Sequence, residues 1–140
     1  MHEYSVLPIA EIPNLGYWIN RYLKTHLDLQ FHETECFGNA WKLMRISSKI
    51  EYVEGYCYMD AGGNKQIPFH HAWNVYNGLA FDFTSDQLFN GNIGNGVNKY
   101  AEVIRTSSRT KARAMMQDKD MEASLLIRNS FPSTFLLSLE

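Results

Sequence analysis

The chain contains only two cysteines, Cys36 and Cys57, and neither stands in a Cys-x-x-Cys or Cys-x-x-His spacing. Such spacings are typical of structural zinc sites, so we expect no metal, and we expect both thiols to stay reduced in a cytosolic protein. An excess of charge is also missing, because 13 basic and 15 acidic side chains leave a net charge of −2. A function in nucleic-acid binding is therefore not expected.

Long apolar runs are absent as well. No run approaches the roughly 18 residues that a membrane-spanning helix needs, and residues 1–13 show no basic head followed by an apolar stretch. We expect a cytoplasmic protein without a membrane partner, or one delivered into a host cytosol if it is an effector or a phage protein. What the 140 residues do contain is 45% hydrophobic and 14% aromatic side chains, enough for the core of a single domain over 1–140. The oligomeric state stays open.

Apolar spacing predicts two helices followed by a sheet. Steps of three and four residues indicate a helix from Asn14 to Leu27, and a second one with Thr34 as its N-cap and an end near Ser47. From Ile50 the apolar residues recur at every second position instead. This spacing predicts three adjacent antiparallel strands over 50–59, 67–76 and 79–84. A loop over 90–98, a strand over 100–104 and a helical segment over 107–128 follow. The expected fold class is α+β, with helices packed on an antiparallel sheet.

Cys36 falls in the first turn of the second expected helix. Unpaired backbone N–H groups and the positive end of the helix dipole stabilise a thiolate at such a place, so Cys36 is a candidate nucleophile. The alternative, a small buried apolar residue, stays open. Cys57 lies in the middle of a strand and is expected to be inert. Glu54, on the same strand, is expected to be a solvated charge.

The pair Asn77-Gly78 strongly favours a two-residue type I′ hairpin turn, which fixes the register of the strands on either side. Counting outward from this turn pairs Trp73 with Asp82 and puts His71 on the same face. His71 and Asp82 are then diagonal neighbours within reach of a side-chain hydrogen bond, which Trp73 would shield from water. His70 faces the other side of the sheet. The count therefore selects one histidine of the adjacent pair.

A cysteine at a helix start, a histidine base and a carboxylate that orients the base are the parts of an acyl-transfer triad. The run HAWNVYNGLAFDFT at 71–84 resembles the transglutaminase-like branch of the papain-like cysteine enzymes. In that family a His-Ala-Trp strand is followed by a Gly-containing turn and a strand that ends in Asp-x-Thr. The run CFGNA at 36–40 is similar to the start of the family's nucleophile helix, and YVEGY at 52–56 resembles the strand that follows.

The resemblance implies a papain-like fold with Cys36 as nucleophile, His71 as general base and acid, and Asp82 as orienting carboxylate. It also implies an oxyanion hole made of the Cys36 N–H and, six residues upstream, the side chain of Gln30, for which His32 competes. The implied activity is that of a thiol protease, amidase or deamidase. Such a hydrolase attacks an amide or ester of a peptide, a protein side chain or a small molecule through a thioester, without a cofactor.

Other interpretations of the same residues stay open at this point. An acyltransferase similar to the arylamine N-acetyltransferases would use the same order of cysteine, histidine and aspartate and would need an acyl donor. A non-catalytic interaction module on the same fold would carry a thiol of ordinary reactivity. A redox-sensing thiol at Cys36 would oxidise readily but turn over no substrate.

Overall fold

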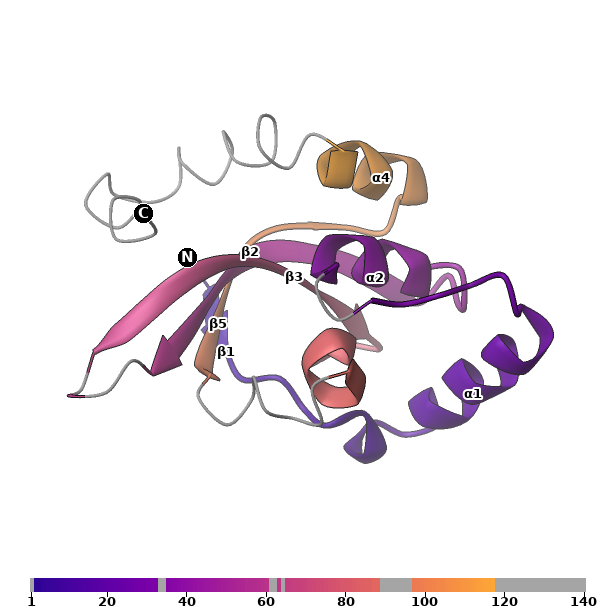
Figure 1. The fold of residues 1–140 in the computed structure, drawn as a ribbon, viewed down its shortest axis with the longest axis horizontal. Coiled ribbons are helices and arrows are strands. Elements are labelled where there is room, and N and C mark those ends of the chain that lie inside the picture. The colour runs from indigo at the N-terminus through magenta and orange to yellow at the C-terminus, as the bar shows by residue number, and fades with distance from the viewer. Residues whose placement is uncertain (1, 33–34, 61–62, 64, 89–96, 118–140) are drawn as a thin grey trace.

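The computed structural model describes residues 2–32, 35–60, 63, 65–88 and 97–117. These residues form an α+β arrangement in which a five-stranded antiparallel sheet carries helices (Figure 1). The strands are β1 (His2–Tyr4), β2 (Ile50–Asp60), β3 (Gln66–Tyr76), β4 (Leu79–Phe81) and β5 (Val97–Thr106). The helices are the 3-10 turn η1 (Ile9–Glu11), α1 (Leu15–Thr25), α2 (Cys36–Leu43), the π-helical turn η2 (Thr84–Leu88) and α4 (Arg109–Gln117).

The sheet has the strand order β1-β5-β2-β3-β4, with antiparallel pairing between all neighbours. The predicted hairpin between β3 and β4 is confirmed, because Asn77 and Gly78 both have positive φ, 51° and 79°, and Tyr76 pairs with Leu79. A glycine adopts this left-handed backbone at little cost. The hairpin thus brings the residues after β4 back alongside the middle of β3.

Two predicted boundaries are wrong. The strand predicted over 79–84 ends at Phe81. Asp82 does not pair with β3; instead, its backbone carbonyl accepts the N–H of Asp86, and this hydrogen bond starts a helical turn. The loop predicted over 90–98 ends earlier, since Val97 and Asn98 belong to β5. The rest of that loop, and the part of the predicted C-terminal helix beyond residue 117, lie outside the described residues.

Two helices, α2 and α4, cover one face of the sheet, here called the outer face. Figure 1 shows α2 lying along β3 with α4 beyond it. Apolar side chains from α1, α2 and α4 pack there against β2, β3 and β4 in the larger core cluster. Its largest fully buried side chains are Leu15, Leu43, Ile50, Tyr52 and Phe81. The amphipathic stripes of the sequence produce this core, because α2 and α4 bury their apolar faces over the sheet and α1 adds Leu15 and Ile19 at its side.

The opposite, inner face of the sheet curves around a smaller cluster. Its buried members are Val53, Cys57, Trp73, Val75 and Tyr100. The chain after β1 closes this face, because the N–H of Leu7 donates to the carbonyl of Ala80 in β4 at 2.8 Å. Tyr4 of β1 adds a side-chain contact, since its hydroxyl accepts the indole N–H of Trp73 at 3.0 Å. The N-terminal segment thus links β5 at one side of the sheet to β4 at the other.

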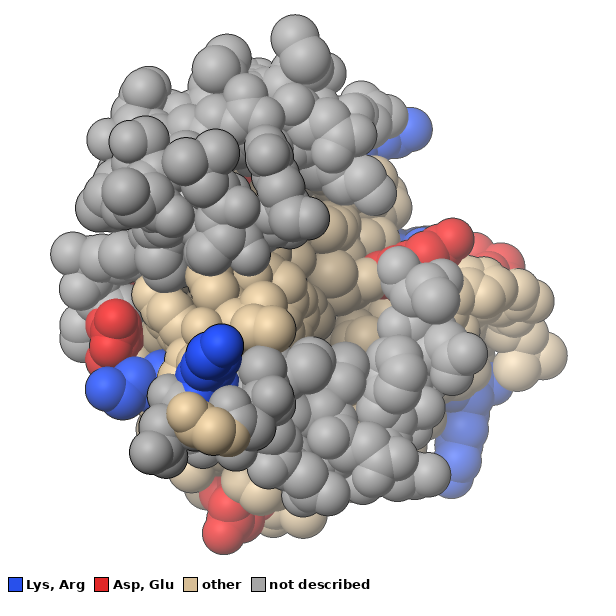
Figure 2. All heavy atoms as spheres, turned by 60° about the vertical axis from the view of Figure 1, so that its left-hand side comes forward, with Lys and Arg blue, Asp and Glu red and all other residues tan. Residues whose placement is uncertain are grey.

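Charged side chains lie in small groups of mixed sign on the face drawn in Figure 2. Ion pairs on the sheet are of this kind, as between Lys99 and Glu3 at 3.6 Å and between Arg105 and Glu102 at 2.6 Å. Within the described ranges, no helix has the length and apolar character needed to cross a membrane.

Candidate active site

His71 and Asp82 meet at the inner face of the sheet. His71 lies on β3, and its Nε2 is 2.8 Å from Oδ2 of Asp82, a hydrogen bond between two buried side chains. The predicted hydrogen bond is therefore confirmed, although Asp82 lies just beyond β4 and is not paired with Trp73 in the ladder. Because Asp82 follows directly after a short strand, its side chain reaches His71 from the end of the hairpin.

Asp82 is held by three donors. Besides His71, the hydroxyl of Tyr100 on β5 donates to Oδ2 at 2.6 Å, and the N–H of Ser85 donates to Oδ1 at 3.2 Å. Both carboxylate oxygens are thus occupied in a site that water does not reach. The orientation of the carboxylate, and through it of the imidazole, is therefore set by β5 and by the start of η2.

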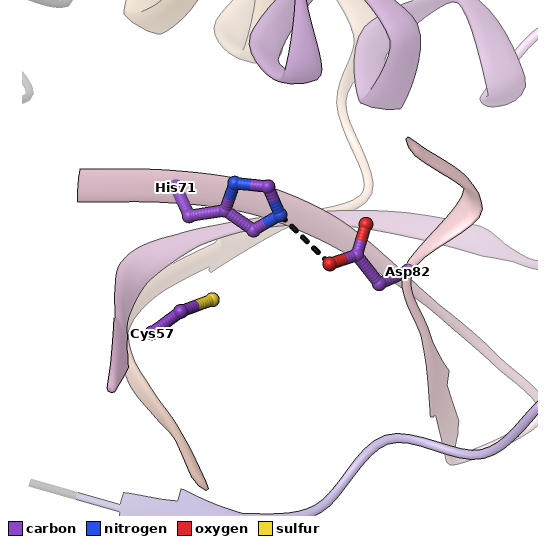
Figure 3. A group of neighbouring side chains, drawn as sticks. All are labelled: Cys57, His71 and Asp82. Atoms are coloured by element: carbon purple, nitrogen blue, oxygen red, sulfur yellow. Dashed lines mark hydrogen bonds and ion pairs between the residues drawn. The ribbon is translucent and has the colours of Figure 1, made fainter. Parts of the chain in front are cut away.

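Cys36 is the first residue of α2, as predicted, and is half-buried. The N-cap position is taken by Glu35 without a side-chain cap, so the predicted cap at Thr34 is wrong; Thr34 itself lies outside the described residues. The Cys36 side chain lies close enough to His71 for its charge and hydrogen bonding to help raise the pKa of the imidazole. Because Nε2 of His71 is engaged by Asp82, Nδ1 is the ring nitrogen left for the thiol. Figure 3 shows that second ring nitrogen on the side of the imidazole away from Cys57.

The electrostatics of His71 follow from these two neighbours. Burial alone would lower the pKa of His71, but the negative charges of Asp82 and Cys36, and the hydrogen bonds to both, outweigh it and raise the pKa to about 10. Burial would raise the pKa of Asp82, but the charge and hydrogen bond of His71, with the donors Tyr100 and Ser85, hold it below its ordinary value. The raised pKa favours the imidazolium form of His71, with Asp82 bound to Nε2.

Cys57 lies closer to the site than the sequence indicates. One ligand atom each from Cys57, His71 and Asp82 lie within 4.8 Å of one another, all from buried side chains (Figure 3). Burial, then the charges of Asp82 and Cys36, raises the pKa of Cys57 well above its ordinary value, so Cys57 remains a neutral thiol. Among the described residues, these three side chains bring together ligand atoms of the kind that could hold a metal ion, and two of them, His71 and Asp82, are joined by the 2.8 Å hydrogen bond.

Aromatic side chains enclose the inner site. The ring of Trp73 lies nearly parallel to that of His71, with centroids 6.3 Å apart, and Trp73 meets Tyr100 edge-on at 5.0 Å. Trp73 is therefore placed as predicted, buried beside the His71–Asp82 bond. Tyr100 was not foreseen as a site residue, because only the pairing of β5 with β2, which puts Tyr100 opposite Cys57, brings it to Asp82.

Gly55 is the residue paired with His71 on β2. A Cβ atom at this position would lie 2.0 Å from the carbonyl oxygen of Ala101 and 2.9 Å from the ring of Trp73. The absence of a side chain therefore allows β5 and Trp73 to approach together, where the pairing of β2 with β5 is irregular. This close approach carries Tyr100 into contact range of Asp82.

The segment before Cys36 is tied to the site by Asn39. This buried amide donates to the carbonyl of His32 at 2.7 Å and to the hydroxyl of Thr84 at 3.0 Å, and it accepts the N–H of His32 at 3.1 Å. Gln30 is exposed, and its carbonyl accepts Lys42 Nζ at 2.7 Å. No contact among the described residues links the Gln30 side chain to the reacting groups, so its oxyanion role stays a prediction.

Glu54 is fully buried, so the expectation of a solvated strand charge is wrong. Its side chain lies on the outer face beneath α2, where it accepts the hydroxyl of Tyr52 at 2.5 Å and lies 3.3 Å from Nε2 of His70. The two donors explain how a carboxylate is tolerated at this depth. His70 is on the opposite face from His71, as the hairpin count predicts.

No protein-family model, curated protein or solved structure matches this chain.

Proposed function

We propose that this chain is a cysteine-dependent acyl-transfer enzyme, a hydrolase of amides or esters built on a papain-like, transglutaminase-like fold. One observation carries the proposal: the buried imidazole of His71 is bound to Asp82 at Nε2, and the Cys36 side chain at the start of α2 lies close enough to help raise its pKa. A purely structural histidine has no need of a half-exposed thiol at a helix start. The order of Cys36 at a helix start, His71 on a later strand and Asp82 just after the next strand also fits that fold.

The reaction begins with Cys36 as a thiolate paired with the His71 imidazolium. The sulfur attacks the carbonyl carbon of the substrate, and the C–O π electrons move to the oxygen. The Cys36 N–H, which has no partner within its own helix, is the first donor to that oxyanion. His71 then gives its proton to the leaving amine or alcohol as the C–N or C–O bond breaks, which leaves an acyl thioester on Cys36.

Asp82 keeps its charge throughout this sequence. It fixes the ring of His71 with Nδ1 toward the sulfur and stabilises the imidazolium, as expected for the orienting member of a triad. Trp73 and Tyr100 exclude water from the His71–Asp82 bond, which strengthens it. The substrate is a peptide, a protein side chain or a small amide or ester, and a cytosolic site of action suits a nucleophile that must stay reduced.

Selective alkylation tests the proposal without a substrate. Iodoacetamide is reacted with the protein from pH 5 to pH 9, and peptide mass mapping separates the two cysteines. We expect Cys36 to be alkylated at pH 6 at least tenfold faster than in the His71→Gln variant, because the imidazolium stabilises the thiolate. Cys57, which is buried with a raised pKa, should react slowly in both proteins.

Two results would contradict the proposal. Equal rates at Cys36 in the two proteins would mean that His71 does not activate it, and the chain would then be better regarded as a binding module. Faster alkylation of Cys57 than of Cys36 would indicate that Cys57, on β2, is the nucleophile. The matched variants Cys36→Ala and Cys57→Ala extend the test, since the first should abolish hydrolysis of an activated ester and the second should retain most of it.

A further inference from the structure

The side chain of Asn39 joins α2 to the segment before it and to η2. Asn39 is fully buried and lies on α2 about one turn after Cys36. Its Nδ2 donates to the carbonyl of His32 at 2.7 Å and to the hydroxyl oxygen of Thr84 at 3.0 Å, and its Oδ1 accepts the N–H of His32 at 3.1 Å. The amide thus uses one N–H on the chain that leads into α2 and the other on η2.

Thr84 belongs to the turn that holds Asp82. It is buried and is the first residue of η2. The next residue, Ser85, donates its N–H to Oδ1 of Asp82 at 3.2 Å, and the N–H of Asp86 donates to the backbone carbonyl of Asp82 at 2.9 Å. A shift of Thr84 would therefore carry these two donors with it. Asn39 connects the helix that begins with Cys36 to the turn that orients the carboxylate bound to His71.

The influence of Cys36 on His71 depends on where α2 lies. A Coulomb interaction weakens as the charges separate, and a hydrogen bond weakens steeply when its angle is lost. The side chains of α2 in the larger core cluster, such as Ala40 and Leu43, are apolar, and burial of apolar surface has no preferred direction. The bond from Asn39 to Thr84 is directional and lies between two buried side chains. It can therefore set a position that apolar packing alone does not define.

We propose that Asn39 is a positioning residue that, through Thr84, fixes the place of Cys36 relative to the pair of His71 and Asp82. This role rests on the proposed function, because it concerns the ionisation of the same thiol. Without the bond to Thr84, the start of α2 and the turn after Asp82 can shift relative to each other. The imidazolium then stabilises the Cys36 thiolate less.

Alkylation of Cys36 by iodoacetamide at pH 6 and at pH 9 measures this effect. A thiol with an ordinary pKa of about 8.5 is largely ionised at pH 9 and hardly at pH 6, so the ratio of the two rates reports activation. Thr84→Val removes the hydroxyl and nearly keeps the shape, and we expect the ratio to fall by about fivefold or more. Thr84→Ser keeps the hydroxyl, so its ratio should stay within about twofold of the wild-type ratio.

Two further changes separate positioning from stability. Leu43→Ala removes buried apolar contacts at the last residue of α2, so it should lower the free energy of unfolding in urea while the ratio stays at the wild-type value. Asn39→Ala should lower the ratio as Thr84→Val does, and the double variant should lower it no further, because both changes break the same bond. If Thr84→Val does not fold, as judged by circular dichroism, Thr84→Ala repeats the test.

The outcomes distinguish this inference from the function on which it rests. A wild-type ratio no higher than that of His71→Gln would overturn the proposed function. A wild-type ratio that depends on His71 but is unchanged in Thr84→Val would overturn the role of Asn39 alone. A ratio in Thr84→Ser or Leu43→Ala as low as that in Thr84→Val would also overturn it, because activation would then follow packing and not the hydrogen bond.

Discussion

The two faces of β3 carry the same kinds of side chain in different surroundings. Each face has a histidine, a carboxylate bound to it and a tyrosine that donates to the carboxylate: His71, Asp82 and Tyr100 inside, His70, Glu54 and Tyr52 outside. The inner contact between histidine and carboxylate is 2.8 Å long and its histidine is 4% exposed; the outer contact is 3.3 Å long and its histidine is 22% exposed.

The two histidines have the same side chain, so the difference between them comes from their surroundings. The inner ring is closed off from water and bound to its carboxylate at close range, so it can hold a charge beside Cys36. The outer ring has a longer contact with its carboxylate and an edge open to solvent. Adjacent positions on one strand thus supply two environments, because successive side chains point to opposite faces.

The largest difference between the inner pair of His71 and Asp82 and the outer pair of His70 and Glu54 should appear when each carboxylate is replaced by its amide. Asp82→Asn keeps the shape but removes the charge that stabilises the imidazolium, so we expect kcat/KM for an activated ester to fall by about 10³ to 10⁴. Glu54→Gln leaves the bond between His71 and Asp82 in place, so we expect a much smaller loss. Burst kinetics with 4-nitrophenyl acetate measure both, and equal losses would contradict the difference in role between the faces.

Removing each tyrosine hydroxyl should give a smaller contrast. Tyr100→Phe deletes a buried hydrogen bond to a charged group, worth about 1.5 to 3 kcal/mol, so we expect activity to fall by roughly tenfold to a hundredfold. Loss of this donor should also move the pKa of Asp82 upward, so the acidic limb of the pH–rate profile should shift to higher pH. Tyr52→Phe is the matched control, and its acidic limb should not move. A loss in Tyr100→Phe without a shifted limb would indicate a packing role.

The smallest expected effect is on the pH dependence of stability. The inner pair of His71 and Asp82 should make the free energy of unfolding change gradually with pH. The pKa of His71 is raised from 6.5 to about 10 in the folded protein, so its contribution to stability is fully present below pH 6.5 and is lost as the pH rises toward 10. The pKa of Asp82 is lowered from 3.8, so its contribution is present above that value and is lost in acid. Urea unfolding of the wild type should therefore show stability declining between about pH 6.5 and 10.

The His71→Gln variant serves as the reference for this measurement. Glutamine does not titrate, so the slope of unfolding free energy between pH 6.5 and 10 should be flatter in the variant than in the wild type. A wild-type curve that rises over this range relative to the variant would contradict the charged pair, because it would mean that folding releases a proton from His71 instead of retaining it.

The parts of the site that the sequence predicts depend on local rules. The turn at Asn77-Gly78 is set by the backbone preferences of two residues, and it alone determines which face His71 occupies. The start of α2 at Cys36 also follows from nearby residues, although the cap was misplaced by one position. The contact with Asp82 was predicted despite a strand boundary that is wrong, because a side chain at the end of a hairpin can still reach its diagonal neighbour.

The missed residues depend on pairings between distant segments. Tyr100 reaches Asp82 only through the pairing of β5 with β2, and Cys57 enters the cluster because it lies opposite Tyr100 in that pairing. Glu54 was misjudged for another reason. A strand glutamate is usually solvated, and only the helix packed over the outer face, with Tyr52 and His70 as donors, makes its burial tolerable. No local pattern in the sequence carries this information.

The pairing of β1 with β5 has a consequence for the order in which the site assembles during folding. The hydroxyl of Tyr4 donates to Glu102 at 2.7 Å, across 98 positions of the chain. Contacts of such long range form late, since the entropy of closing the intervening loop must be overcome first. Until β5 has joined the sheet, Tyr100 is not in place and Asp82 lacks one of its three donors. The carboxylate that orients His71 is therefore among the last parts of the site to be fixed.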